Sequence, residues 1–263
     1  MTIGELKTRL HATWTTGDYE TFARYMEPGA LAFYERLGVE PGARLLDVGC
    51  GAGQLALIAA RTGAVVTGCD IAENWIERAR GRAFDEGLSA VFDVADAEAL
   101  PYRDGEFDVV ASMIGAMFAP QPELVAAEMK RVCRGGGTIA MANWTAEGFI
   151  GQMFKAIAKY IAPPGMPSPV LWGDERVVRE RMRDGILALT CTKRMYAFVY
   201  PFPPADVVEF FRKHYGPMAR AFEAAGASGL RDELVALWSV ANTGLNGTTH
   251  VEAEYLEVVA VRA

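Results

Sequence analysis

One short segment, LLDVGCGAG at Leu45–Gly53, constrains the fold of this chain more than any other. Its apolar half predicts a buried strand, and its glycines predict a turn that leads into a helix over Gln54–Arg61. Gly49, Gly51 and Gly53 let the backbone approach a ligand that a side chain would exclude. Such a turn presents backbone N–H groups and the positive end of a helix. The segment is therefore typical of a nucleotide-type site, although a tight turn with nothing bound would also explain it.

Apolar periodicity predicts alternating strands and helices around this segment. We expect strands at Arg44–Gly49, Val65–Cys69, Ala90–Val94, Phe107–Met113, Thr138–Trp144, Thr190–Tyr200 and Glu254–Val261, and helices at Ile71–Phe84 and Pro122–Arg134. The alternation predicts an α/β fold with a doubly wound, Rossmann-like sheet. In full, we predict seven strands, mostly parallel, with an antiparallel last strand and a helical insertion after the fifth strand.

The second half of the chain departs from this regular alternation of strands and helices. A long stretch separates Trp144 from the next strand signal near Ala188, and it holds a predicted helix at Gly148–Ile161 and the proline-rich Ala162–Pro169. Insertions of this length are typical of lids and binding loops. Two more helical stretches are predicted at Pro204–Ala225 and Arg231–Ala241. We expect a single domain over 1–263, divided into a helical cover (1–41), a cofactor-binding core (42–144), a lid (145–187) and a C-terminal part (188–263).

Composition excludes several classes of protein. The chain has 263 residues, a net charge of −7 and a pI near 5.1, so a nucleic-acid partner is not expected. No segment approaches the ~20 apolar residues that span a bilayer, and none is typical of a signal peptide, which predicts a cytoplasmic protein. Cys50, Cys69, Cys133 and Cys191 form no CxxC pair, so we expect neither a metal site nor a disulfide framework. A monomer and a homodimer are both compatible with the sequence.

Two features point to the kind of ligand. Asp70 ends the second predicted strand, about where an acidic residue reaches a ribose diol in dinucleotide-binding folds. A helix N-cap would also explain Asp70. The dinucleotide fingerprint G-x-G-x-x-G requires a last glycine, but this chain has Gln54 there. A ligand with a ribose and no pyrophosphate therefore fits better than a dinucleotide.

Four segments, in order, resemble the motifs of class I S-adenosylmethionine-dependent methyltransferases. They are LLDVGCGAG, VVTGCDIAENWIERAR (Val65–Arg80), FDVADAEALPYRDGEFDVVASM (Phe92–Met113) and RVCRGGGTIAMANW (Arg131–Trp144). The resemblance covers about residues 42–144 and is nearest to the branch of ubiquinone/menaquinone-type methyltransferases. It implies S-adenosyl-L-methionine as cofactor, S-adenosyl-L-homocysteine as product and a small-molecule methyl acceptor.

The resemblance also implies roles for individual residues. Gly49 and Gly51 would pass close to the methionine moiety, and Asp47 would brace their loop. Cys50, Gly53 and Gln54 of the same loop are expected to belong to the cofactor site. Asp70 would accept hydrogen bonds from the ribose hydroxyls, and Ile71 and Trp75 would line the adenine. Asp96 would accept from the adenine amino group, with the Ala97 N–H nearby. Met113 would lie near the sulfonium. Helix–sheet packing is an equally good explanation of Trp75, and Asp93 is a rival for Asp96.

The acceptor is expected to be small and apolar or aromatic. The residues expected around it are Trp14, Tyr19, Phe118, Trp144, Phe149 and His214, each of which core packing could also explain. No catalytic base is assigned, and the segment after the fourth strand lacks the Asn/Asp-Pro-Pro-Tyr signature of DNA-base methylases. Two alternatives stay open: an NAD(P)-dependent oxidoreductase, which Gln54 disfavours, and a non-catalytic binding protein that keeps the fold.

Overall fold

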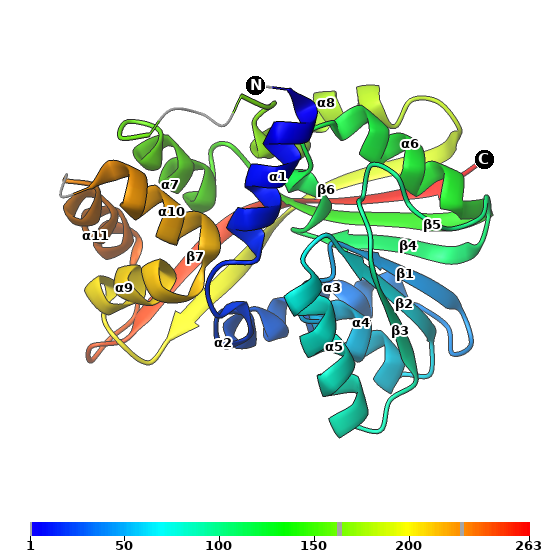
Figure 1. Ribbon diagram of the computed structural model, residues 1–263, viewed down its shortest axis with the longest axis horizontal. Coiled ribbons are helices and arrows are strands. Elements are labelled where there is room, and N and C mark those ends of the chain that lie inside the picture. Colours follow the sequence, from blue (N-terminus) through cyan, green and yellow to red (C-terminus); the bar gives the residue numbers. More distant parts are fainter. Residues whose placement is uncertain (1, 162–164, 227–228) are drawn as a thin grey trace.

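A computed structural model describes residues 2–161, 165–226 and 229–263 of the chain. Its centre is a seven-stranded sheet in the order β3-β2-β1-β4-β5-β7-β6 (Figure 1). The first five strands pair in parallel, and β7 pairs antiparallel with both β5 and β6. The predicted α/β sheet is confirmed. Its strands are β1 (Arg44–Val48), β2 (Val65–Asp70), β3 (Ala90–Val94), β4 (Phe107–Met113), β5 (Cys133–Trp144), β6 (Ile186–Tyr200) and β7 (Thr249–Arg262).

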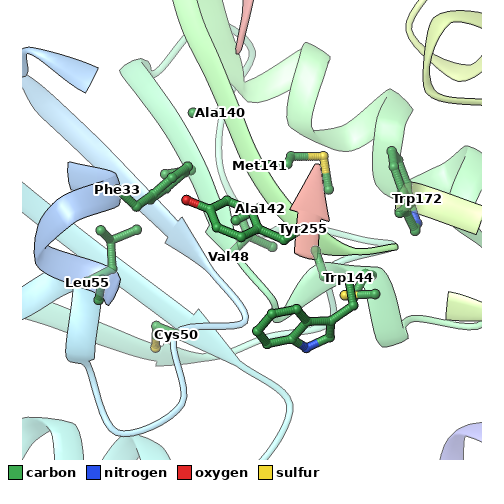
Figure 2. Close-up of a cluster of buried hydrophobic side chains, with 14 of the residues drawn as sticks. Phe33, Val48, Cys50, Leu55, Ala140, Met141, Ala142, Trp144, Trp172 and Tyr255 are labelled. Carbon is green, nitrogen blue, oxygen red and sulfur yellow. The ribbon is translucent and has the colours of Figure 1, made fainter. Parts of the chain in front are cut away.

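Helices cover both faces of this sheet, which is why its central strands are mainly apolar. On one face lie α3 (Glu27–Leu37), α4 (Gln54–Arg61) and α5 (Glu73–Asp85), and on the other lie α6 (Pro122–Val132) and α8 (Glu175–Arg181) (Figure 1). Figure 2 shows part of the resulting core, with Phe33, Tyr255 and Trp144 on the α3 side of the sheet and Met141 and Trp172 on the other.

A second group of helices lies beyond the carboxyl ends of the parallel strands. It combines α1 (Ile3–Trp14), α2 (Tyr19–Ala23) and η1 (Arg24–Met26) from the start of the chain with α7 (Phe149–Ile157) and η3 (Pro169–Gly173) after β5. It also includes α9 (Pro204–His214), α10 (Gly216–Ala225) and α11 (Leu230–Ala241), which are inserted between β6 and β7 at the end of their long hairpin (Figure 1). Residues distant in sequence therefore meet above the strand ends.

Several predicted elements differ in their bounds from the structure. The single helix expected at Pro204–Ala225 is two helices, because Tyr215 is extended (φ −106°, ψ 107°) before Gly216 and Pro217. Gly135–Gly137, expected to end a helix, belong to β5. β6 and β7 are longer than predicted because they pair with each other from Ile186 to Tyr200, and backbone pairing stabilises residues whose side chains are exposed. In the part of the chain that the structure describes, none of the helices is both long and apolar enough to cross a bilayer.

Candidate functional site

A cavity opens between the strand ends and the second group of helices. It contains about 1180 Å³ of space not filled by protein atoms, counting its mouth. Many residues predicted for the two ligands line it together: Trp14, Gly49, Gly51, Asp70, Ile71, Trp75, Asp96, Ala97, Met113, Phe118 and Trp144. A smaller hollow of about 440 Å³ shares Gly49, Gly51 and Met113 with it and adds Asp47, Cys50 and Gln54. The topology thus brings four separate sequence segments to one place.

The turn after β1 is shaped by glycine. Gly49, Gly51 and Gly53 have φ of 71°, 53° and 83°, a region in which side chains are strained. The N–H groups of Gly49 and Cys50 both donate to the Cys69 carbonyl, at 2.8 and 2.9 Å, which ties the turn to the end of β2. Gly53 faces away from both hollows, and a Cβ there would lie 3.3 Å from Phe92. The positive φ favours glycine here, and the tight contact with Phe92 adds to that preference.

Asp70 holds this turn from the neighbouring strand. Its Oδ2 accepts a hydrogen bond from the Gly51 N–H and its Oδ1 accepts one from the Ala72 N–H, both at 2.9 Å. Helix α5 has Ala72 as its N-cap residue, so Asp70 does not fill that position. Burial raises the pKa of Asp70, and these two N–H groups oppose the rise. Because a carboxylate can accept about four hydrogen bonds, two remain available for ligand hydroxyls.

Asp47 lies deeper, below the glycine turn. Its side chain is only 2% exposed and accepts a hydrogen bond from the Ala56 N–H at 3.1 Å, which braces the start of α4. Burial raises the pKa of this carboxyl to about 7, and the neighbouring charge of Asp70 adds to the rise. The site therefore contains an acid that titrates near neutral pH and would be stabilised in its charged form by a cationic ligand group.

Asp47→Asn is expected to change how the stability of the ligand-free protein depends on pH. A carboxyl whose folded pKa is about 7, against 3.8 unfolded, favours folding below pH 4, and this contribution is lost as the pH rises through 7. The unfolding free energy of Asp47→Asn relative to wild type should therefore rise by about 2–3 kcal/mol from pH 5 to pH 8. Urea unfolding at the two pH values measures it, with the exposed Asp85→Asn as control. If the difference in unfolding free energy between Asp47→Asn and wild type is the same at pH 5 and pH 8, Asp47 does not titrate in this range.

The loop after β3 places Asp96 against the cavity. Its Oδ1 accepts a hydrogen bond from the Glu98 N–H at 2.9 Å, and its Oδ2 accepts one from Lys7 Nζ at 2.6 Å. The rival Asp93 does not line the cavity, and its carboxylate accepts a hydrogen bond from Tyr102 at 3.0 Å. Of the two acids, the geometry therefore favours Asp96 as the one that meets a ligand.

The loop after β4 contains residues to which sequence reasoning assigned no individual role. Ser112 Oγ donates to the Val48 carbonyl at 2.6 Å and accepts from the Ala116 N–H at 2.9 Å. Ile114 is held at φ 62°, a strained conformation for a β-branched residue, and it lines both hollows. A Cβ on Gly115 would lie 2.4 Å from the Gly49 carbonyl oxygen. A glycine just beyond the end of a predicted strand, as in the first turn, was the signal that could have identified Gly115.

The far half of the cavity is apolar. Besides Trp14, Phe118 and Trp144, its wall includes Phe22, Ile150, Met153, Phe154, Phe198, Phe211 and Tyr215. Trp14 packs at 5.0 Å from Phe118, measured between ring centroids, and its carbonyl accepts a hydrogen bond from Trp75 Nε1 at 2.5 Å. Trp75 therefore both packs in the core and lines the cavity. The charged residues of the lining, Lys7, Asp70 and Asp96, all lie in the other half.

Three residues predicted near the acceptor are not placed on this wall. Phe149 is buried against Trp238, 4.5 Å between ring centroids, and His214 packs on Phe210 with its Nδ1 3.7 Å from Asp18 Oδ2. Neither lines the cavity. The side chain of Tyr19 lies outside the described residues. Among the residues with described positions, no three His, Cys, Asp or Glu side chains are grouped as metal ligands.

Comparisons with known proteins agree with this geometry. A family model described as a methyltransferase domain matches residues 46–141. The chain is 40% identical over 219 residues to an uncharacterized protein of Mycobacterium tuberculosis, covering 82% of this chain and 80% of that one. It is 30% identical over 235 residues to the 27-O-demethylrifamycin SV methyltransferase of Amycolatopsis mediterranei, covering 86% and 72%. The solved structure of the YcgJ protein from Bacillus subtilis is similar in fold, with a TM-score of 0.64, 17% identity and coverage of 89% and 98%.

Proposed function

Since the chain belongs to the class I S-adenosylmethionine-dependent methyltransferases, we propose that it transfers a methyl group to a small, uncharged and largely apolar acceptor. One observation carries the proposal: a single cavity has acidic side chains and a glycine turn at one end and an aromatic wall at the other. The kinship to the ubiquinone/menaquinone-type branch remains a prediction.

The polar end suits S-adenosylmethionine. The positive-φ turn at Gly49 and Gly51 leaves backbone open to the cavity, and the buried acid Asp47 lies beside it, where an ammonium group would offset its charge. Asp70 keeps two acceptor positions for ribose hydroxyls, and Asp96 lies where an adenine amino group could donate. When bound, this cofactor supplies an activated methyl group on a positively charged sulfur.

The protein's own part in the reaction is positioning and exclusion of water. Met113 and Ile114 follow β4 and line both hollows, so in this proposal they would meet both ligands at the point of transfer. Orientation of two reactants can contribute roughly 7–11 kcal/mol to lowering a barrier. The aromatic wall favours an apolar acceptor and disfavours a charged one, because an unpaired charge is costly to bury there.

The rest of the chain would serve this site. In our proposal residues 1–41 form a cover over 42–144, and 145–187 together with the helices between β6 and β7 form the acceptor wall, within one domain. The relative that acts on 27-O-demethylrifamycin SV is named for a substrate that lacks an O-methyl group. This name supports a hydroxyl oxygen as the acceptor atom.

Calorimetric titration tests the cofactor. S-adenosylhomocysteine is expected to bind with a dissociation constant in the micromolar range or below, and NAD is expected not to compete, because Gln54 occupies the position of the last fingerprint glycine. Binding of NAD in place of S-adenosylhomocysteine would refute the proposal and favour an oxidoreductase.

A transfer assay tests the reaction and the acceptor class. With S-adenosylmethionine and a panel of neutral aromatic alcohols and phenols, we expect kcat/KM at least tenfold above that of carboxylate-bearing analogues. The rate at which S-adenosylhomocysteine is released, together with the amount of methylated product formed, measures kcat/KM for each acceptor. A preference for the charged analogues would contradict the apolar acceptor. Binding of S-adenosylhomocysteine with no turnover of any compound in a broad panel would favour a non-catalytic binding protein.

A further inference from the structure

Helix α1 is attached to two of the segments that line the polar end of the cavity. Lys7 Nζ lies 2.6 Å from Asp96 Oδ2 and 2.5 Å from Glu98 Oε2, in the loop after β3. One turn further along, His11 Nε2 lies 2.6 Å from Glu73 Oε2 at the start of α5. The spacing of these residues places them on one side of α1. The helix therefore bridges two segments that the sequence does not connect to it.

The same helix forms part of the apolar wall. Leu10 and Trp14 line the cavity, and the Trp14 ring lies 5.0 Å from Phe118 and 6.0 Å from Tyr215, measured between centroids. The position of α1 therefore decides whether the acceptor half of the cavity has a complete wall. A residue that holds α1 against the polar end of the cavity therefore affects the shape of the apolar wall as well.

Lys7 is the attachment with the largest expected effect. The Glu98 side chain is 1% exposed, and its carboxylate also accepts hydrogen bonds from the backbone N–H and the Nε2 of Gln121, at 2.6 and 2.7 Å. Across the described parts of the chain, Lys7 is the only cation within ion-pair distance of Glu98. A buried carboxylate that loses its cation is destabilising. The His11–Glu73 pair is exposed on both sides, so it contributes little.

We propose that Lys7 is a positioning residue that couples binding of the cofactor to closure of α1 over the acceptor site. This inference rests on the proposed function. A ligand that donates to Asp96 orders the loop that carries both carboxylate partners of Lys7. Ordering this loop favours the state in which Lys7 is engaged, and α1 then holds Leu10 and Trp14 against the cavity. Coupling of this kind requires no contact between Lys7 and the reacting atoms.

Hydrogen–deuterium exchange with S-adenosylhomocysteine as the probe tests the coupling. In the wild type, saturation with this ligand should slow exchange of the α1 amides at least fivefold, together with those at the start of α4 and α5. In Lys7→Met, saturation should still protect α4 and α5 but leave α1 exchange within twofold of the ligand-free rate. Lys7→Arg, which keeps the cation, should restore protection of α1. By calorimetry, Lys7→Met should weaken the ligand about five- to tenfold and Lys7→Arg less than twofold.

Matched variants separate this role from a general loss of stability. Lys193 on the edge strand β6 has an exposed side chain that forms an ion pair with Glu254 of β7 at 3.0 Å, so Lys193→Met should behave as wild type. If Lys7→Met does not fold, the double variant Lys7→Met/Glu98→Gln removes both charges and should fold yet still lack ligand-dependent protection of α1. Equal protection of α1 in wild type and in the Lys7→Met or double variant would overturn the coupling. Absence of ligand binding by the wild type would instead refute the proposed function.

Discussion

Asp70→Ala is expected to weaken binding of S-adenosylhomocysteine at least tenfold. In the proposed site the change removes the acceptor of two ligand hydroxyls, and each hydrogen bond to a charged group contributes about 1.5–3 kcal/mol. It also removes the acceptor of the Gly51 and Ala72 N–H groups, so the glycine turn loses one of its links to β2. Calorimetric titration at pH 7.5 measures the change in dissociation constant.

The control for this variant is Asp85→Ala. Asp85 is exposed and is the last residue of helix α5, whereas Asp70 lies just before the first residue of that helix. Its replacement should leave the dissociation constant within twofold of wild type. If Asp70→Ala also binds within twofold of wild type while remaining folded, Asp70 is not part of the cofactor site.

Gly115→Ala is expected to displace the glycine turn after β1 and to weaken ligand binding. The new Cβ would lie 2.4 Å from the Gly49 carbonyl oxygen and 2.8 Å from Gly49 Cα, and both are backbone atoms that cannot rotate away. One of the two loops must move, so the turn that approaches the cofactor is displaced. We expect a loss of about 1–3 kcal/mol in unfolding free energy, as for overpacked cores, and at least tenfold weaker binding of S-adenosylhomocysteine.

Gly81→Ala is the matched glycine substitution. Gly81 lies inside α5, and nothing is within 4 Å of the position of an added Cβ. Alanine there should raise the unfolding free energy by about 0.5–1 kcal/mol and leave ligand affinity unchanged. Urea unfolding measures the change in unfolding free energy of both variants, and calorimetric titration measures their affinity for S-adenosylhomocysteine. Wild-type affinity in Gly115→Ala would show that the contact between the two loops does not shape the site.

The cofactor end of the site was largely predictable from sequence, for a local reason. Gly49, Gly51, Asp70, Asp96 and Met113 each come directly after a predicted strand, or close to its end. Parallel strands present their carboxyl ends at one edge, so finding the strands was enough to bring these residues together. Strand periodicity and turn glycines are properties of a few neighbouring residues, and no knowledge of the rest of the fold was needed.

The acceptor end was predicted only in part. Trp14, Phe118 and Trp144 line the cavity, but Phe149 packs against Trp238 in the core instead. Helical periodicity identifies which residues of α7 are apolar, but it does not say which neighbour each of them faces. The facing partner is set by α11, a helix inserted between β6 and β7 far along the chain.

By itself the sequence determined the α/β sheet, the glycine turn and the acids at the strand ends, because each depends on short-range spacing and backbone geometry. Only the tertiary structure decided the features made by side chains distant in sequence. These are the ion pairs of Lys7 with Asp96 and Glu98, the contact of Gly115 with Gly49, and the burial that raises the pKa of Asp47 to about 7. Burial and ion pairing depend on which surfaces meet, and that is set by the packing of the whole chain.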